Sequence, residues 1–488
     1  IKIKFMNFKA FGGTRLLSDT LVYGISNIFQ KSFSFLIVFF ISKNLTVENY
    51  GIIDFILTLI SLSTIIIIFG QDYAVARFFN QEIKKEKKKI VISQSLTIHL
   101  IQIIFFLPII LIVIFFLKKI YLIPNSDINI IIFTVLTIFS LVIINFCQII
   151  LRYSFKRSKF IIISFIQGFS FFLSIIYLIN YSNLYIQKIL LFYFIINVII
   201  LLISVYSIKS WLIAPKKNWI NYQLIKYGFS FGVISLLTSL SMVYERFFVM
   251  EFVNTYYLGI YSLALKVGII AQIIMQSILF GWEPYFLSNL RNKNLAINLN
   301  LMIKITVFIS LVLAFFLGSI GEYIILFLGN ENYLEAQYYI IPIVIGVIFQ
   351  ELYRIPSSGI LESKKVYWCT VVQFFCFAFL ILALFFLKDF INLKIIVSLI
   401  CLNYFIRFIS LSFISNYVSK IKLDLTKLTF ILAIYATLIL IIYYFDIFSL
   451  NQFMKFMILL LSSGCILYFF LNLNEIKIIK KILINFFR

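Results

Sequence analysis

Four basic side chains lie inside long apolar stretches of the sequence, where a positive charge is costly. They are Lys31, Arg246, Lys266 and Arg407. An ammonium or guanidinium group at the centre of a bilayer costs about 3 kcal/mol on insertion scales and well above 10 in simulations. Such a group needs water, a counter-charge or an anionic ligand. These four cations are therefore candidate binding groups for an anion.

Polar residues follow these cations at helical spacing. Asn27 lies four residues before Lys31, and Asn403 lies four residues before Arg407, so each amide shares a helix face with a cation. Further stripes with steps of three and four are Asp54, Thr58 and Ser61; Ser95, His99 and Gln102; Ser235, Ser239 and Arg246, with Thr238, Ser241 and Glu245 beside them; and the pair Gln272 and Gln276. The stripes predict a water-filled cavity. The alternative for any single Ser or Thr is a hydrogen bond between packed helices.

Acidic residues and one histidine within the apolar stretches are candidates for coupling to H+ or Na+. They are Asp54, Glu245, Glu351 and His99. For His99 we expect a hydrogen-bonded packing role, with proton relay as the alternative. Arg246 lies near the outer end of its stretch beside Glu245, so a local ion pair is an alternative role for it.

Two further acid and base pairs can satisfy each other within one helix. Asp72 lies five residues before Arg77, and Glu351 lies three residues before Arg354. Spacings near one helical turn allow ion pairs on a single helix surface.

The elements that must position these groups are membrane-spanning helices. Hydrophobic residues make up 62% of the 488 positions and charged residues 12%, so no soluble core could bury this apolar surface. A helix needs about 20 apolar residues to cross the hydrocarbon layer. We predict an all-α protein with about fourteen spans, because barrel strands alternate strictly and are shorter. The spans are expected near 17–42, 52–70, 91–117, 129–151, 160–180, 184–207, 224–250, 258–281, 301–328, 336–360, 366–387, 391–416, 425–447 and 450–472.

Lys and Arg are concentrated in alternate connections between these spans. The loops around residues 77–89, 152–159 and 209–226 are rich in them, whereas the intervening loops carry few. The positive-inside rule then places both termini in the cytoplasm. The net charge of +23 is explained by topology and by attraction to anionic membrane lipids, so we expect no nucleic-acid partner.

A short motif occurs twice and divides the chain. Tyr23-Gly24 and Tyr50-Gly51 begin the first two spans, and Tyr227-Gly228 and Leu258-Gly259 begin the seventh and eighth. A parallel repeat predicts two pseudo-symmetric lobes, 1–207 and 208–416, around a central cavity, with 417–488 as two appended spans. The alternative is that such residue pairs occur commonly at helix ends and do not indicate a repeat.

The sequence shows no feature of an enzyme. No loop is long enough for a folded domain, and there is no paired acidic metal motif, Gly-rich phosphate loop or nucleophile elbow. We therefore expect no catalytic residue, no metal site and no cofactor beyond a coupling ion. The excess of cations within the spans predicts an anionic cargo.

Several segments resemble the bacterial polysaccharide-exporting flippases of the multidrug/oligosaccharidyl-lipid/polysaccharide (MOP) transporter superfamily. They are RLLSDTLVYG (15–24), LTVENYG (45–51) and FGQDYAVARFF (69–79), and in the second half YG (227–228), YERF (244–247) and LGIY (258–261). In that family the acid before the arginine is more usually Asp, so Glu245 is a departure.

The resemblance implies a multi-pass flippase of the bacterial inner membrane. Its cargo would be an undecaprenyl-pyrophosphate-linked oligosaccharide of O-antigen or capsule type, moved to the outer leaflet by alternating access. Its partners would be membrane lipids and the polymerase and chain-length proteins of the same pathway. On this hypothesis Lys31, Lys266 and Arg407 neutralise the pyrophosphate and Arg246 helps near the outer mouth. The alternatives are a flippase for teichoic-acid or lipid II precursors, a cation-coupled drug antiporter, or a membrane polysaccharide polymerase.

Overall fold

The computed structural model describes residues 32–82, 84–119, 128–154, 156–181, 185–214, 220–288, 295–363, 365, 367–390 and 392–419, and in these ranges every regular element is a helix. This confirms the predicted all-α class. After a helix at Ser32–Asn44, the α-helices are α2 (Val47–Ile68), α3 (Gln71–Gln81), α4 (Lys85–Lys119), α5 (Ile128–Tyr153), α6 (Arg157–Tyr181), α7 (Ile186–Ile208), α8 (Tyr222–Phe252), α9 (Thr255–Ser288), α10 (Leu295–Ser319), α11 (Gly321–Leu328), α12 (Gln337–Leu352), α13 (Arg354–Glu362), α14 (Tyr367–Phe386) and α15 (Leu393–Val418). Short 3-10 helices are η2 (Lys209–Trp211), η3 (Glu331–Ala336) and η4 (Lys388–Phe390).

Eleven helices in the described part of the chain are long and apolar enough to cross a membrane. They begin with Val47–Ile68 and end with Leu393–Val418, and they correspond in order to the second to twelfth predicted spans. The first predicted span is described only from residue 32. The two spans predicted at 425–447 and 450–472 lie outside the described residues.

Polar side chains fix several helix starts. Thr46 accepts a hydrogen bond from the backbone N–H of Asn49 at the start of α2, and Asn392 accepts one from Ile395 at the start of α15. Side chains of this kind satisfy N–H groups that have no partner within the helix. Both caps occur in short connections between apolar stretches, so they define where a span can begin.

A left-handed turn at Phe69 and Gly70 separates α2 from α3. The φ angles are 41° and 71°, in the region that favours glycine. A Cβ atom on Gly70 would collide with the carbonyl oxygen of Gly228 and lie 2.5 Å from the amide nitrogen of Gly232. Gly70 in the turn and Gly228 and Gly232 on α8 therefore allow the turn to contact the backbone of α8.

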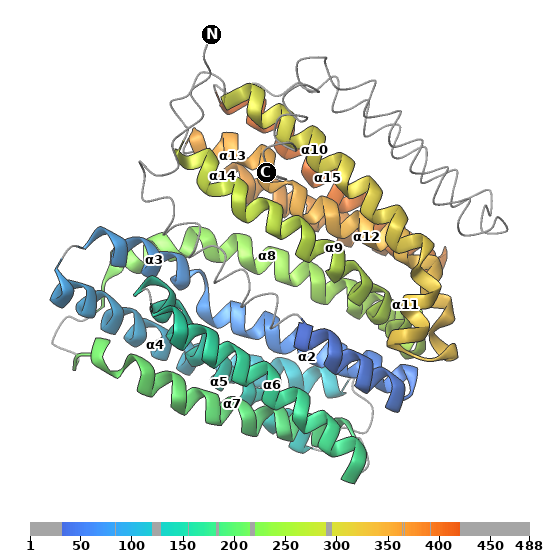
Figure 1. Cartoon of the computed structure of the whole chain (residues 1–488), viewed down its shortest axis with the longest axis horizontal. Helices are drawn as coiled ribbons and strands as arrows, with labels where there is room; N and C mark the ends of the chain where they lie inside the picture. Colours follow the sequence, from blue (N-terminus) through green and yellow to red (C-terminus); the bar gives the residue numbers. More distant parts are fainter. Residues whose placement is uncertain are drawn as a thin grey trace, which may run out of the picture. The chain divides into compact units, whose positions relative to one another are not determined.

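The structure divides into two compact units between Gly259 and Ile260. In unit 1, α5 packs on α7, α2 and α4, while α2 and α3 both pack against α8 (Figure 1). The lobe boundary after residue 207, expected from the repeat, stays a prediction.

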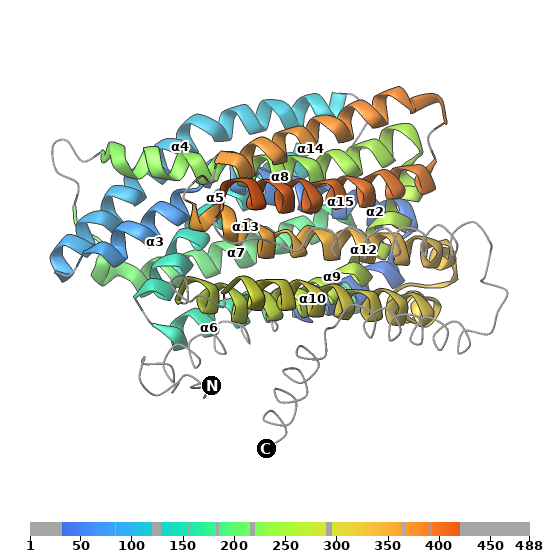
Figure 2. The same ribbon diagram turned by 90° about the horizontal axis from the view of Figure 1, so that it is seen from above.

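In unit 2, α12 and α15 pack together, with α10 against α12 and with α13 and α14 against α15 (Figure 2). A cluster of Ile360, Val372, Cys376 and Leu411 forms a core between α13, α14 and α15. This arrangement encloses the predicted site residue Arg407 of α15.

The glycines of the sequence repeat contact each other within unit 1. A Cβ atom on Gly51 would lie 2.6 Å from the amide nitrogen of Gly259, and one on Gly259 would collide with the carbonyl oxygen of Val47. Small residues of this kind allow two helix backbones to approach closely. The start of α2 thus lies directly against the start of α9.

Candidate functional site

Three hydroxyl groups of the polar stripes are satisfied within their own helices. Thr58, Thr238 and Ser241 each donate to the carbonyl oxygen four residues earlier, at 2.7, 2.9 and 2.9 Å. Ser and Thr commonly make this bond when they lie within a helix. For these three residues the hydrogen bond lies within one helix and not between packed helices, which was the alternative considered from the sequence.

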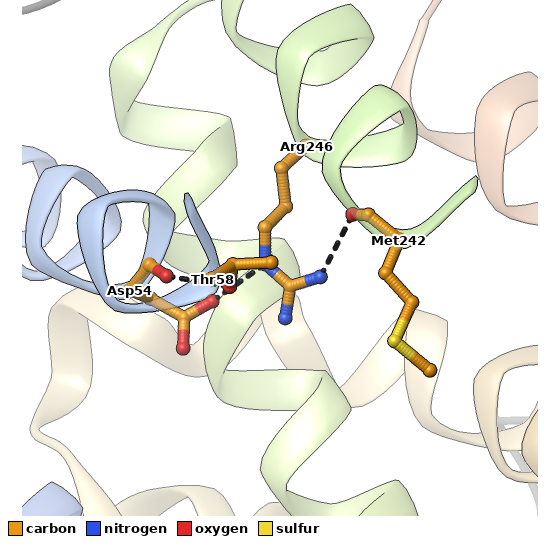
Figure 3. A network of polar contacts seen from close by, with 4 residues as sticks. All are labelled: Asp54, Thr58, Met242 and Arg246. Atoms are coloured by element: carbon orange, nitrogen blue, oxygen red, sulfur yellow. Dashed lines mark hydrogen bonds and ion pairs between the residues drawn. The ribbon is translucent and has the colours of Figure 1, made fainter. Parts of the chain in front are cut away.

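Asp54 and Arg246 form a buried ion pair between α2 and α8. The Nε of Arg246 lies 2.8 Å from Oδ2 of Asp54, and Nη1 donates to the carbonyl oxygen of Met242 at 3.1 Å (Figure 3). The two side chains are 11% and 4% exposed. The sequence suggested the neighbouring Glu245 as partner, but this bridge is made to Asp54 on another helix. It brings together one predicted binding residue and one predicted coupling acid.

A second buried carboxylate, Glu351 of α12, is held by three side chains in unit 2. Gln272 and Gln276 of α9 both donate to its Oε1, at 2.9 and 3.0 Å. Arg354 lies 3.4 Å from its Oε2, which confirms the pair expected from their spacing. The sequence showed the two glutamines at a step of four but not their shared acceptor.

Arg407 is buried within unit 2 with unmet hydrogen-bonding capacity. It is 3% exposed, and its guanidinium carbon lies 3.8 Å from the ring centroid of Tyr353. In the described part of the chain, its Nε and Nη1 and the Oδ1 of Asn403 have no hydrogen-bond partner. A buried polar group without a hydrogen-bond partner lowers the stability of the folded protein, and a charged group without one lowers it more. The predicted pair Asn403 and Arg407 therefore does lie together in the interior of the unit.

The remaining predicted residues are placed as follows. Lys266 is half-buried on α9, and Glu245 is buried on α8. His99 is 2% exposed on α4, its Nδ1 lies 2.8 Å from the carbonyl oxygen of Ser95, and its ring packs 5.0 Å from that of Phe146. These contacts agree with a packing role for the histidine. Lys31 and Asn27 lie outside the described residues.

The expected pair between Asp72 and Arg77 is not among the described ion pairs. The Arg77 guanidinium instead lies over the ring of Tyr227, with its central carbon 4.4 Å from the ring centroid. Asp72 is half-buried near Arg152, and the partial removal of water from its carboxyl group raises its pKa. Asp72 therefore has a different charged neighbour from the one its spacing suggested.

Comparisons with known proteins agree with this architecture. Residues 16–290 match the family described as polysaccharide biosynthesis protein. No curated protein matches the sequence. Among solved structures, the lipid II flippase MurJ in an inward closed conformation has a TM-score of 0.66 at 15% identity, over 92% of this chain and 98% of that one.

Two transporters of the MOP superfamily are also similar in fold. An inward-facing multidrug resistance MATE family transporter has a TM-score of 0.62 at 12% identity, covering 80% of this chain and 94% of that chain. A transporter from Pyrococcus furiosus, described by the reverse polarity of its binding pocket, has a TM-score of 0.55 at 13% identity, covering 82% and 94%.

The helices, the fold and the family match lead to one assignment. The eleven membrane-spanning helices of the described ranges and the family match indicate a multi-pass protein of the inner membrane, and its fold is the two-lobed fold of MOP transporters. The family match covers more than half of the sequence. The chain therefore belongs to the polysaccharide biosynthesis protein family, as the sequence resemblance predicted.

Proposed function

We propose that the protein is a flippase that moves undecaprenyl-pyrophosphate-linked oligosaccharide repeat units to the outer leaflet of the inner membrane. The cargo is an O-antigen or capsule precursor, and movement occurs by alternating access. The family assignment and the likeness to a lipid II flippase support the class of cargo.

Such a cargo needs a protein path because its head group is strongly polar. About ten sugar hydroxyls, at about 2 kcal/mol each for entering hydrocarbon unpaired, give a barrier near 20 kcal/mol. That barrier alone slows spontaneous crossing to the order of once a minute, and the pyrophosphate charge slows it much further. A hydrated and cationic path removes both penalties while the polyprenyl tail stays in lipid.

The burial of Arg407 and its unmet hydrogen-bonding capacity are the observation on which the proposal rests. Its guanidinium is buried in an apolar helix, and two of its nitrogens have no hydrogen-bond acceptor in the described part of the chain. A diphosphate offers the acceptors that a guanidinium fork prefers. Lys266 adds a second positive charge in unit 2, where the carboxylate of Glu351 is already held by Arg354 and two amides.

The remaining roles follow from the same chemistry. Lys31 acts with Lys266 and Arg407 on the pyrophosphate, and Arg246, whose charge is balanced by Asp54, supports the outer side. Asn27 and Asn403 hydrogen-bond sugar or phosphate oxygens. Asp54, His99, Glu245 and Glu351 are the groups available for coupling to H+ or Na+, and one charge moved through 100 mV supplies about 2.3 kcal/mol.

Complementation of cells that lack this gene tests the proposal. Lys31→Ala, Lys266→Ala and Arg407→Ala are each expected to abolish surface polysaccharide at an unchanged protein level. Arg407→Lys keeps the charge and should restore part of the signal. The matched control is Lys394→Ala, because Lys394 is exposed at the first turn of the same helix as Arg407 and should complement fully. Full complementation by all three alanine variants would overturn the proposal.

The lipid II precursor is the second candidate cargo, favoured by the similarity to MurJ over 92% of this chain. The two are separated by the intermediate that accumulates in the cytoplasmic leaflet when the gene is silenced. Accumulated oligosaccharide repeat units support the first cargo, and accumulated lipid II supports the second. Ethidium efflux above that of cells without the gene would instead indicate a drug antiporter.

A further inference from the structure

A cavity of about 420 Å³ lies within unit 1, between the ends of several helices. Its wall includes Ile65 and Ile68 of α2, Ile149 of α5 and Phe160 of α6. The positive-inside rule places this end of the unit on the cytoplasmic side, because α5 ends at Tyr153 just before Lys156 and Lys159. Its size falls within the range of small-molecule sites, which combine an apolar wall with a few convergent polar groups.

One face of α5 supplies polar groups to this cavity. Asn145, Gln148 and Arg152 follow at steps of three and four, and all three line it. In the described ranges, no hydrogen bond is recorded for the side-chain amide of Asn145 or Gln148. Each amide carries both donors and an acceptor, so these two side chains can hydrogen-bond groups that are themselves both donors and acceptors.

Asp72 and Tyr73 of α3 line another part of the cavity. The Arg152 charge acts on the Asp72 carboxyl group, so the two groups partly offset one another. Tyr73 is 48% exposed and stacks on Phe231 with ring centroids 4.7 Å apart. The lining thus offers balanced charge, two free amides and an aromatic ring.

We propose that this cavity binds a sugar unit of the lipid-linked substrate on the cytoplasmic side. Sugar hydroxyls both donate and accept hydrogen bonds, as the amides of Asn145 and Gln148 do. The apolar C–H face of a sugar ring can pack on the exposed ring of Tyr73. The inference rests on the proposed flippase function and adds a glycan-recognition site to it.

The charge of the cavity argues against a diphosphate as its ligand. A diphosphate site needs excess positive charge, whereas here Asp72 offsets Arg152. Two of the three cations proposed for the pyrophosphate, Lys266 and Arg407, belong to unit 2, and neither is among the described residues that line this cavity. Sugar and pyrophosphate therefore have separate recognition groups in the chain.

Equilibrium binding to the full-length protein in lipid nanodiscs tests this site with three probes. The first is the lipid-linked oligosaccharide extracted from cells that lack this gene. The second is the free oligosaccharide released from it by mild acid, measured by competition, and the third is undecaprenyl pyrophosphate. The variants are Asn145→Leu and Gln148→Glu, and the matched control is Thr137→Val. Thr137 lies on the same helix but bonds to the carbonyl oxygen of Phe133.

Each variant is expected to weaken binding of both glycan-bearing probes about tenfold, because Asn145→Leu removes the amide and Gln148→Glu replaces N–H donors with a carboxylate that can only accept. Binding of undecaprenyl pyrophosphate and the melting temperature should stay unchanged, and the control should match the wild type. Wild-type affinity for the glycan in both variants would overturn the site. Equal weakening for undecaprenyl pyrophosphate would also overturn it, in favour of a diphosphate site.

The outcomes also separate this inference from the proposed function. If no probe binds the wild-type protein, the flippase proposal fails and the site fails with it. If all probes bind and only Lys266→Ala and Arg407→Ala weaken undecaprenyl pyrophosphate, the flippase proposal stands. In that case unchanged glycan binding by Asn145→Leu and Gln148→Glu rejects the cavity as a glycan site and leaves the flippase proposal in place.

Discussion

Arg246 of α8 is held by Asp54 of α2, with Nε and Oδ2 2.8 Å apart. The sequence repeat assigns these two helices to different predicted lobes, although both lie in unit 1. Because both side chains are largely buried, each depends on the other for compensation of its charge.

Removing one member of this pair should be far more damaging than removing both. Asp54→Asn or Arg246→Met leaves one buried charge uncompensated, which costs about 3–5 kcal/mol. The double variant removes both charges and should recover much of that loss. Thermal unfolding of the purified protein measures the effect, and a double-variant loss equal to the sum of the single losses would contradict it.

The surface pair of Lys89 and Glu86 provides a control for the same measurement. Their charged atoms lie 3.5 Å apart, but Glu86 is 74% exposed. Exposed pairs of this kind contribute about 0–1 kcal/mol. Glu86→Gln should therefore shift the melting temperature only slightly.

The close approach of Gly51 and Gly259 gives a second prediction. The Cβ added by Gly51→Ala would lie 2.6 Å from a backbone nitrogen, and backbone cannot move aside as a flexible side chain can. Overpacking of this kind costs about 1–3 kcal/mol. We expect a lower melting temperature for Gly51→Ala. Gly346→Ala is the matched control, because its nearest contact would be 3.4 Å away, and an equal loss there would contradict the argument.

The sequence predicted the spans and the helical class well because both follow from local properties. Apolar length and loop charge define a membrane helix without reference to any other part of the chain. The eleven described spans follow the predicted order for this reason. The pairing of Glu351 with Arg354 was also predictable, since the two residues lie one helical turn apart.

The tertiary partners could not be read from the sequence. Asp54 and Arg246 are 192 residues apart, and their pairing depends on the rotation of two helices about their axes. From the sequence, only the adjacent Glu245 could be named as a partner for Arg246. The polar face of Asn145, Gln148 and Arg152 has the same steps of three and four as the stripes identified from sequence. It was missed because Arg152 was interpreted as a loop charge that sets topology.

Asp72 gives a prediction for the pH dependence of stability. Burial raises the pKa of its carboxyl group above 3.8, and the backbone N–H groups and Arg152 offset only part of that effect. Between pH 3.8 and the raised pKa, the folded chain binds more protons than the unfolded chain, so this group makes stability fall as pH rises. Asp72→Asn should therefore melt at a higher temperature than the wild type at neutral pH.

The difference between Asp72→Asn and the wild type should shrink as the pH falls through the raised pKa of Asp72, because the carboxyl group of the folded wild type then becomes protonated. Melting curves between pH 4 and pH 8 measure it. Glu86→Gln is the control, since Glu86 is 74% exposed and gains little from losing its charge. A difference in melting temperature that stays constant across this pH range would show that the charge of Asp72 does not cause the difference in stability.

Glu351 and His99 give opposite predictions for ion coupling. Glu351 binds two amides of α9 and faces Arg354 of α13, so a change of its charge alters contacts among three helices. The described hydrogen bonds of His99 are made within α4, so its titration would break none between helices in the described part of the chain. We expect Glu351→Gln to abolish gradient-driven transport of the lipid-linked oligosaccharide in membrane vesicles, and His99→Gln to retain it. Wild-type transport should stop when an uncoupler and a sodium ionophore are added together. Transport that persists under this treatment would exclude coupling to either ion, and with it the role assigned to Glu351.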